Sequence, residues 1–237
     1  MRFTFRPLPG LSIACAILFA LLIGLGVWQI QRLHWKLALI ASVNAHLSDS
    51  PITVDRALAM GKDAQYHRVV LTGRFANDRE TYIFTTTADG APIYHVLTPF
   101  RSDDGRTFMV DRGAVPKELL EPSSRSPITG PTRLVGIWRV PDAAGFFTPP
   151  PEPAHRLWFS RDVTAMARLD GVRLAAPVLI EADATPNPGG WPKGGQTVVT
   201  FPNNHLSYAL TWFGLAGGLL GVYLAFHMSK GRLKFGS

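Results

Sequence analysis

The sequence has 237 residues, of which 46% are hydrophobic and only 17% are charged. A soluble domain usually carries about 25% charged residues, so part of this chain is predicted to lie in lipid. Its basic excess does not indicate a nucleic-acid-binding protein, because most of that excess flanks two apolar runs near the ends instead of gathering on a folded domain. The single cysteine, Cys15, excludes a disulfide or a multi-cysteine metal site within the chain.

The first apolar run predicts a transmembrane helix over residues 11–31, preceded by a tail at residues 1–10. The stretch from Leu11 to Ile30 carries no charge, and at about 1.5 Å per residue it covers the roughly 30 Å of bilayer hydrocarbon. A cleaved signal peptide is the alternative, but its apolar region is normally about 7–15 residues and ends in small residues. This run is longer and ends in WQIQRLHWK, and residues 33–47 can continue its helix beyond the membrane surface.

The second apolar run predicts a transmembrane helix over residues 205–227, followed by a tail at residues 228–237. Asn204 precedes it as a good helix N-cap, and Pro202 lies just outside the helix start. Small residues recur four apart in both runs and predict that the spans pack on each other or on a partner's helices. They are Gly214 with Gly218, Gly217 with Gly221, and Ala16 with Ala20 and Gly24.

Charge on the two tails predicts the orientation of the chain. Arg2 and Arg6 precede the first run, and Lys230, Arg232 and Lys234 follow the second, whereas all 17 acidic residues lie between the runs. Basic flanks favour the cytoplasmic side, so we expect both termini to be cytoplasmic in a multi-pass protein of the bacterial inner (cell) membrane. Residues 32–204 then form a periplasmic domain, or one in the intermembrane space if the source is mitochondrial.

The intervening residues are typical of a mainly antiparallel β domain with short helices, which makes the whole chain a membrane α+β protein. Turn signals such as Asp104-Gly105 separate the β-branched and aromatic segments at spacings too short for βαβ units. We expect a loop at residues 141–154 and a short helix at residues 162–169, capped by Ser160 or Asp162. The predicted strands are residues 66–75, 80–87, 93–101, 106–115, 132–140 and 178–182.

Motifs for catalysis are missing from the sequence. It contains neither GxSxG nor HExxH, and GGWPKGGQT at residues 189–197 fails the spacing of a phosphate-binding loop. Asp103 and Asp104 are interpreted as turn residues, and His67 and His95 as structural histidines within strands. A membrane-tethered hydrolase or sensor is therefore disfavoured.

The entrance of the second span is the chemically unusual place. The run NNHLSYALTWF puts His205 in the first turn of a membrane helix, and Tyr208 and Trp212 follow it at helical spacing. An ionisable residue at such a helix is a candidate for function, and interfacial anchoring is the alternative. A neutral imidazole can coordinate a metal or haem iron, and an aromatic deeper in the helix can stack on a flat macrocycle.

These runs resemble the surfeit locus protein 1 family over nearly the whole chain. The resemblance lies in GVWQIQRLHWK, YHRVVLTGRF, VLTPF, VDRGAVP at 110–116, RLWFSRDVTAMA at 156–167 and GGQTVVTFPNNHLSYALTWFGLA at 194–216. Ala114 departs from it, since tryptophan is expected there.

The resemblance implies a non-enzymatic assembly factor for haem–copper cytochrome c oxidase, which binds haem a transiently and assists its insertion into oxidase subunit I. It implies His205 as the residue in contact with haem, as a candidate iron ligand, with Trp212 and Tyr208 beside it. Oxidase subunit I, haem a synthase and the lipid bilayer are the implied partners. The alternative is a haem-independent membrane scaffold that stabilises newly made oxidase subunit I.

Overall fold

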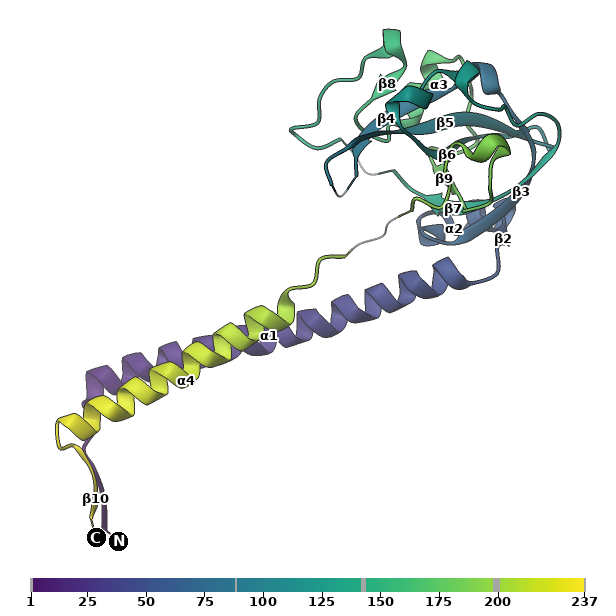
Figure 1. Cartoon of the computed structure of the whole chain (residues 1–237). Coiled ribbons are helices and arrows are strands. Elements are labelled where there is room, and N and C mark those ends of the chain that lie inside the picture. Colours follow the sequence, from purple (N-terminus) through teal and green to yellow (C-terminus); the bar gives the residue numbers. More distant parts are fainter. Residues whose placement is uncertain (1, 88, 142–143, 198–200, 237) are drawn as a thin grey trace. The chain divides into compact units, whose positions relative to one another are not determined.

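A computed structural model describes residues 2–87, 89–141, 144–197 and 201–236. The chain divides into two compact units, which Figure 1 shows and which are described separately below. We call residues 1–42 with 200–237 the helix pair, and residues 43–199 the β domain.

The helix pair is built from α1 (Pro9–Ser48), of which residues beyond Ser42 belong to the β domain, and α4 (His205–Ser229). Both helices are long and apolar enough to cross a membrane, as the sequence predicts, and α1 continues beyond the predicted span to Ser48. Beside them, β1 (Arg2–Phe5) and β10 (Leu233–Gly236) form a two-stranded antiparallel ribbon, with Phe5 opposite Leu233. This ribbon lies in the predicted tails and has no counterpart among the predicted elements.

Helices α1 and α4 lie side by side in Figure 1, and their buried residues form a narrow seam. In the part of α1 that belongs to the helix pair, the buried residues described are Leu22, Gly26 and Gln29, at the alternating spacing of four and three that is typical of a coiled-coil seam. Ala209 and Ala216 are buried opposite them on α4. At the end where the ribbon lies, the hydroxyl groups of Ser12 and Tyr223 are 2.5 Å apart.

The small residues that bring the helices together differ from those predicted. Gly214, Gly217, Gly218 and Gly221 have no described atom within 4 Å of the position a Cβ would take, and they are exposed. Gly26 makes the close approach instead, because a Cβ at this position would overlap the ring of Phe213. The spans therefore do pack on each other, but through a different set of small residues.

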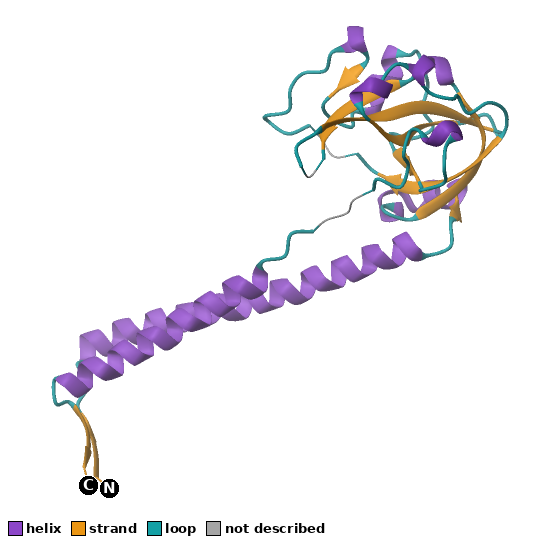
Figure 2. Cartoon of the chain, in the orientation of Figure 1, coloured by secondary structure: helices purple, strands orange, loops and turns teal. Residues whose placement is uncertain are grey.

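The β domain is built on one eight-stranded sheet, drawn in orange in Figure 2. The strand order is β2-β3-β7-β9-β6-β5-β4-β8. The bounds are β2 (Ile52–Thr53), β3 (Arg68–Phe75), β4 (Thr81–Thr86), β5 (Pro92–Ser102), β6 (Thr107–Val115), β7 (Thr132–Arg139), β8 (Leu157–Trp158) and β9 (Leu179–Ala182). The short helices are α2 (Val54–Met60) and α3 (Val163–Leu169), and short 3₁₀ turns lie between strands.

An additional pairing between β3 and β5 closes five of these strands, β3-β7-β9-β6-β5, into a small barrel. Gly73 lies where the two strands meet, and a Cβ there would overlap the backbone of Arg101. Glycine is the residue that permits such a close backbone approach at a barrel corner. Phe100, Phe108 and Trp138 fill the interior as part of one apolar core.

A second core lies under α3, where Val163 and Met166 pack against Leu97, Met109 and Leu179 of the sheet. Asp162 caps this helix by accepting a hydrogen bond from the backbone N–H of Ala165 at 2.9 Å. The prediction of a helix at residues 162–169, and of Asp162 as one of its two candidate caps, is thereby confirmed.

All six predicted strands are present, but the antiparallel character is only partial. The pairs β2–β3, β4–β8 and β6–β9 are parallel. Two of these pairs involve two-residue strands, which are too short for a pattern of alternation to be detected. The third pair, β6–β9, joins strands from distant parts of the chain. The residue pattern within a strand does not specify which other strand it pairs with.

Candidate functional site

The candidate site lies where α4 begins in the helix pair. Asn204 occupies the N-cap position, as predicted, although its side chain makes no capping hydrogen bond within the described residues. His205 is the first residue of the helix and is half-buried. Because α4 starts at this residue, the imidazole is placed at the edge of the seam between the two helices.

Gln29 of α1 is the partner of this histidine. Nδ1 of His205 donates a hydrogen bond to Oε1 of Gln29 at 2.7 Å, and Gln29 is 9% exposed. A histidine that donates from Nδ1 is oriented in its plane, and its Nε2 remains available to coordinate a metal. The arrangement is therefore that of an oriented ligand, with the glutamine in the supporting position.

Sequence reasoning missed Gln29, although a signal was present. It is one of two glutamines at the end of an otherwise uncharged run, in WQIQ. In lipid a buried amide needs a hydrogen-bond partner, so a polar residue on the seam face predicts a contact with the other helix. The sequence does not reveal which residue of the second span provides that contact.

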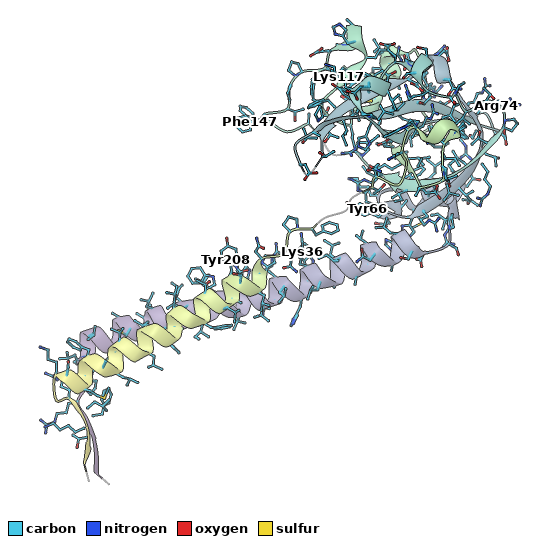
Figure 3. All side chains as sticks on the ribbon, in the orientation of Figure 1. Lys36, Tyr66, Arg74, Lys117, Phe147 and Tyr208 are labelled. Carbon is cyan, nitrogen blue, oxygen red and sulfur yellow. The ribbon has the colours of Figure 1, made fainter. Side chains whose placement is uncertain are left out.

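The two aromatic residues predicted beside His205 differ in their surroundings. Trp212 is half-buried, two turns along α4 on the same side as His205 and the buried Ala209 and Ala216. Tyr208 is 55% exposed, and Figure 3 shows it pointing away from α1. The structure thus brings Trp212, and not Tyr208, to the seam face that His205 occupies.

A cation lies near the same end of the helix pair. Nζ of Lys36 on α1 is 5.1 Å from the ring centre of Phe201, four residues before His205. Lys36 lies two turns beyond Gln29 on one face of α1, since the two are seven residues apart. This end of the helix pair therefore combines an oriented imidazole with a positive charge, which together suit a metal complex that carries acidic groups.

Close packing at Gly26 holds Gln29 against α4, so we expect Gly26→Ile to separate the helices. The branched side chain would overlap Phe213, and such overpacking typically costs about 1–3 kcal/mol. In a Cys15→Ser background, spin labels at the exposed positions Leu21 and Leu215 would report a longer and broader distance distribution.

Gly24→Ile is the matched control for this change. No described atom lies within 4 Å of the Cβ position at Gly24, so the same substitution two residues away should leave the label distance unchanged. An equal effect of both substitutions would show that helix composition, and not the contact with Phe213, decides the separation.

The chain is similar to known proteins over most of its length. A protein-family model described as the SURF1 family matches residues 16–217. Surfeit locus protein 1 of Mus musculus is 37% identical over 212 residues, which cover 81% of this chain and 67% of that protein. Surfeit locus protein 1 of Homo sapiens is 35% identical over 214 residues, covering 81% and 69%. A SURF1-like protein of Monosiga brevicollis is 37% identical over 224 residues, covering 88% and 84%. Both the family match and the length of these similarities show that the chain belongs to the SURF1 family.

Proposed function

We propose that this protein is an assembly factor for haem–copper cytochrome c oxidase, which holds haem a transiently at His205 and assists its insertion into oxidase subunit I. Membership of the SURF1 family supports the assembly role. The observation that carries the haem part is the hydrogen bond from His205 Nδ1 to Gln29, because it orients the ring and leaves Nε2 for iron.

Each residue of the site has a distinct part in this proposal. His205 binds the haem iron, and Gln29 holds the imidazole in the orientation that this requires. Trp212 offers an aromatic surface on the same side of α4, against which a flat macrocycle can pack. Lys36 supplies a positive charge that suits the propionate groups of haem. Tyr208 has the smallest part, because its side chain points away from the seam.

The protein is proposed to be a carrier and not an enzyme, with haem a as its cargo. A membrane location suits a cargo with an apolar tail, and the basic tails support cytoplasmic termini with the β domain on the opposite side of a bacterial inner membrane. Oxidase subunit I is the proposed recipient, and haem a synthase the proposed donor.

The visible spectrum of the purified full-length chain tests this proposal. After expression together with haem a synthase, the protein should show the absorption bands of haem a. His205→Ala should abolish them, whereas Gln29→Leu, which keeps the ligand but removes its support, should lower the haem content or affinity by about 10–100-fold.

His34→Ala is the matched control, since His34 is another histidine of the helix pair but lies exposed on α1. It should retain the haem content of the unmodified protein. Purified protein without haem a bands, or bands that persist in His205→Ala, would contradict the haem proposal. Continued crosslinking to subunit I in haem-deficient cells would then favour the haem-independent scaffold.

A further inference from the structure

The β domain contains a polar cavity that the proposed haem site does not use. Its volume is about 410 Å³, which falls within the range of roughly 300–1,000 Å³ that small-molecule sites occupy. Five neighbouring strands, β4, β5, β6, β9 and β7, contribute to its wall, together with Arg161 and residues 196–197. Charged side chains on these strands decide what the cavity can hold.

Two carboxylates lie side by side in this wall. Asp111 of β6 and Glu181 of β9 are direct partners in the register of the two strands, and they are only 4% and 5% exposed. Asp111 is fully paired, because its Oδ1 accepts the backbone N–H of Gly113 at 2.8 Å and its Oδ2 lies 2.7 Å from Nδ1 of His95. Burial alone would lower the pKa of His95, but the adjacent carboxylate of Asp111 outweighs it and raises that pKa above its usual value. Asp111 and His95 are therefore partners in a buried hydrogen bond.

The carboxylate of Glu181, by contrast, accepts no hydrogen bond from a described residue. The Nε atoms of Arg139 and Arg161 both face its Oε1, at 3.6 and 3.7 Å, which is too long for hydrogen bonds. Among the described residues, neither Nε atom has a hydrogen-bond partner, and neither do Oε2 of Glu181 and Oγ1 of Thr197. Four buried polar atoms at one cavity therefore lack partners within the part of the chain that the structure describes, whereas buried polar atoms in proteins are nearly always hydrogen-bonded.

The charged side chains that line the cavity limit the kinds of ligand that it can bind. Arg139 and Arg161 contribute two positive charges, Asp111 and Glu181 two negative ones, and protonation of His95 adds at most one more. A simple anion would meet both carboxylates, and a simple cation would meet both guanidinium groups. No group of three metal-ligating side chains occurs in the described ranges of the chain, so a metal ion is not favoured either.

We infer that this cavity binds a small zwitterion that carries a carboxylate and an ammonium group, such as an α-amino acid. Its carboxylate would accept from the guanidinium groups of Arg139 and Arg161, and its ammonium group would donate to the carboxylate of Glu181. Thr85 and Thr86 at the end of β4, with the adjacent Thr87, would surround the remainder of the molecule.

Two sequence runs that carry the family resemblance meet at this cavity. Asp111 and Gly113 belong to VDRGAVP, and Gln196 and Thr197 belong to the run that begins GGQT. The haem proposal gives a role to the far end of the second run, at His205, but to neither of these pairs. A ligand site in the β domain gives both runs a function that does not depend on haem.

Thermal unfolding of the full-length chain in detergent tests the inference, with each of the common L-amino acids added singly at about 10 mM. At least one should raise Tm by a few degrees, and it should do so equally in His205→Ala, which separates this site from the haem proposal. Calorimetry should then show that the deaminated acid and the decarboxylated amine of that amino acid each bind at least about tenfold more weakly.

Substitutions of residues that line the cavity are the second part of the test. Glu181→Gln and Arg161→Gln should each weaken binding by about tenfold or more. Arg161 is 40% exposed, so its substitution is expected to leave the fold intact even if Glu181→Gln does not. Arg68→Gln is the matched control, because Arg68 makes an ion pair of the same 3.7 Å length with Asp183 but does not line the cavity.

Three results would overturn the inference. If no amino acid changes Tm, the cavity holds water only. If the amine or the acid alone binds as tightly as the amino acid, the ligand is not recognised as a zwitterion. If Arg161→Gln keeps the full affinity, binding takes place elsewhere on the chain.

Discussion

Replacing Glu80 with alanine is expected to lower the free energy of unfolding of the β domain by about 3–5 kcal/mol. Glu80 is buried between two arginines: its Oε1 accepts from Arg112 at 2.8 Å, and its Oε2 accepts from Arg125 at 2.6 Å. Both arginine side chains are at most 3% exposed, so removal of the carboxylate leaves two buried positive charges with no ionised partner among the described residues. Such uncompensated buried charge is among the largest single-residue penalties known in proteins.

Neighbouring groups show how strongly this carboxylate acts on its surroundings. Burial and the charge of Glu80 together raise the pKa of Tyr82 to about 12, and the tyrosine hydroxyl donates to Oε2 of Glu80. Burial lowers the pKa of Arg112, and Glu80 opposes that change. The glutamate is therefore the negative centre of a buried cluster, and we expect the stability of the cluster to depend on it.

Denaturant unfolding of the full chain in detergent measures this effect. Trp138 and Trp158 are buried in the two cores of the domain, and their fluorescence reports its unfolding. Glu152→Gln is the control, because Glu152 pairs with His155 on the surface and its loss should change stability by no more than about 0.5 kcal/mol. A Glu80→Ala variant as stable as that control would show that solvent or rearrangement compensates the two arginines.

Gly113→Ala is expected to cost about 3–5 kcal/mol, the sum of a backbone and a packing penalty. Gly113 has a φ of +117°, which residues with a side chain rarely adopt. A Cβ at this position would also overlap the backbone of Lys193, which pairs with the neighbouring Ala114 through two hydrogen bonds of 3.0 Å. Since the clash is with backbone, no side-chain rotation relieves it.

A control at Gly105 separates the two penalties. Gly105 has a φ of +87° but no described atom within 4 Å of its Cβ position, so Gly105→Ala should show the backbone penalty alone, about 1–2 kcal/mol. Hydrogen exchange should show loss of protection at Lys193 and Ala114 in the Gly113 variant only. Equal unfolding free energies for the two variants would refute a special role for the contact between residues 113 and 193.

The Gly113 contact also connects stability to the polar cavity. Residues 193–197 lie across β6 and β9, where the N–H of Gly195 donates to the carbonyl oxygen of Ala182 at 3.0 Å. Thr197, which lines the cavity, follows in the same segment. A substitution that displaces Lys193 should therefore weaken ligand binding at the cavity as well as the fold.

Local chemistry explains why much of the fold could be predicted from the sequence. The length and apolarity of the two runs predict their helices, because a membrane span must satisfy its backbone within itself. Alternating β-branched residues and turn signals predict the six longer strands of the β domain, and Asp162 predicts the start of α3. The position of His205 at the first turn of α4 follows from Asn204 and Pro202 in the same way.

Contacts between distant residues were decided only by the tertiary structure. The closure of the barrel by β3 and β5, the pairing of Glu80 with Arg112 and Arg125, and the meeting of Asp111 with Glu181 each join segments whose separation no local pattern encodes. At the helix pair, the sequence alone placed His205 and Trp212 on α4, but the side of α4 that meets α1 depends on Gly26 and Phe213. The lack of a side chain at Gly26 lets the ring of Phe213 approach α1, and this contact sets which faces of the two helices meet. Gln29 lies on that face of α1, and it is therefore the residue that orients His205.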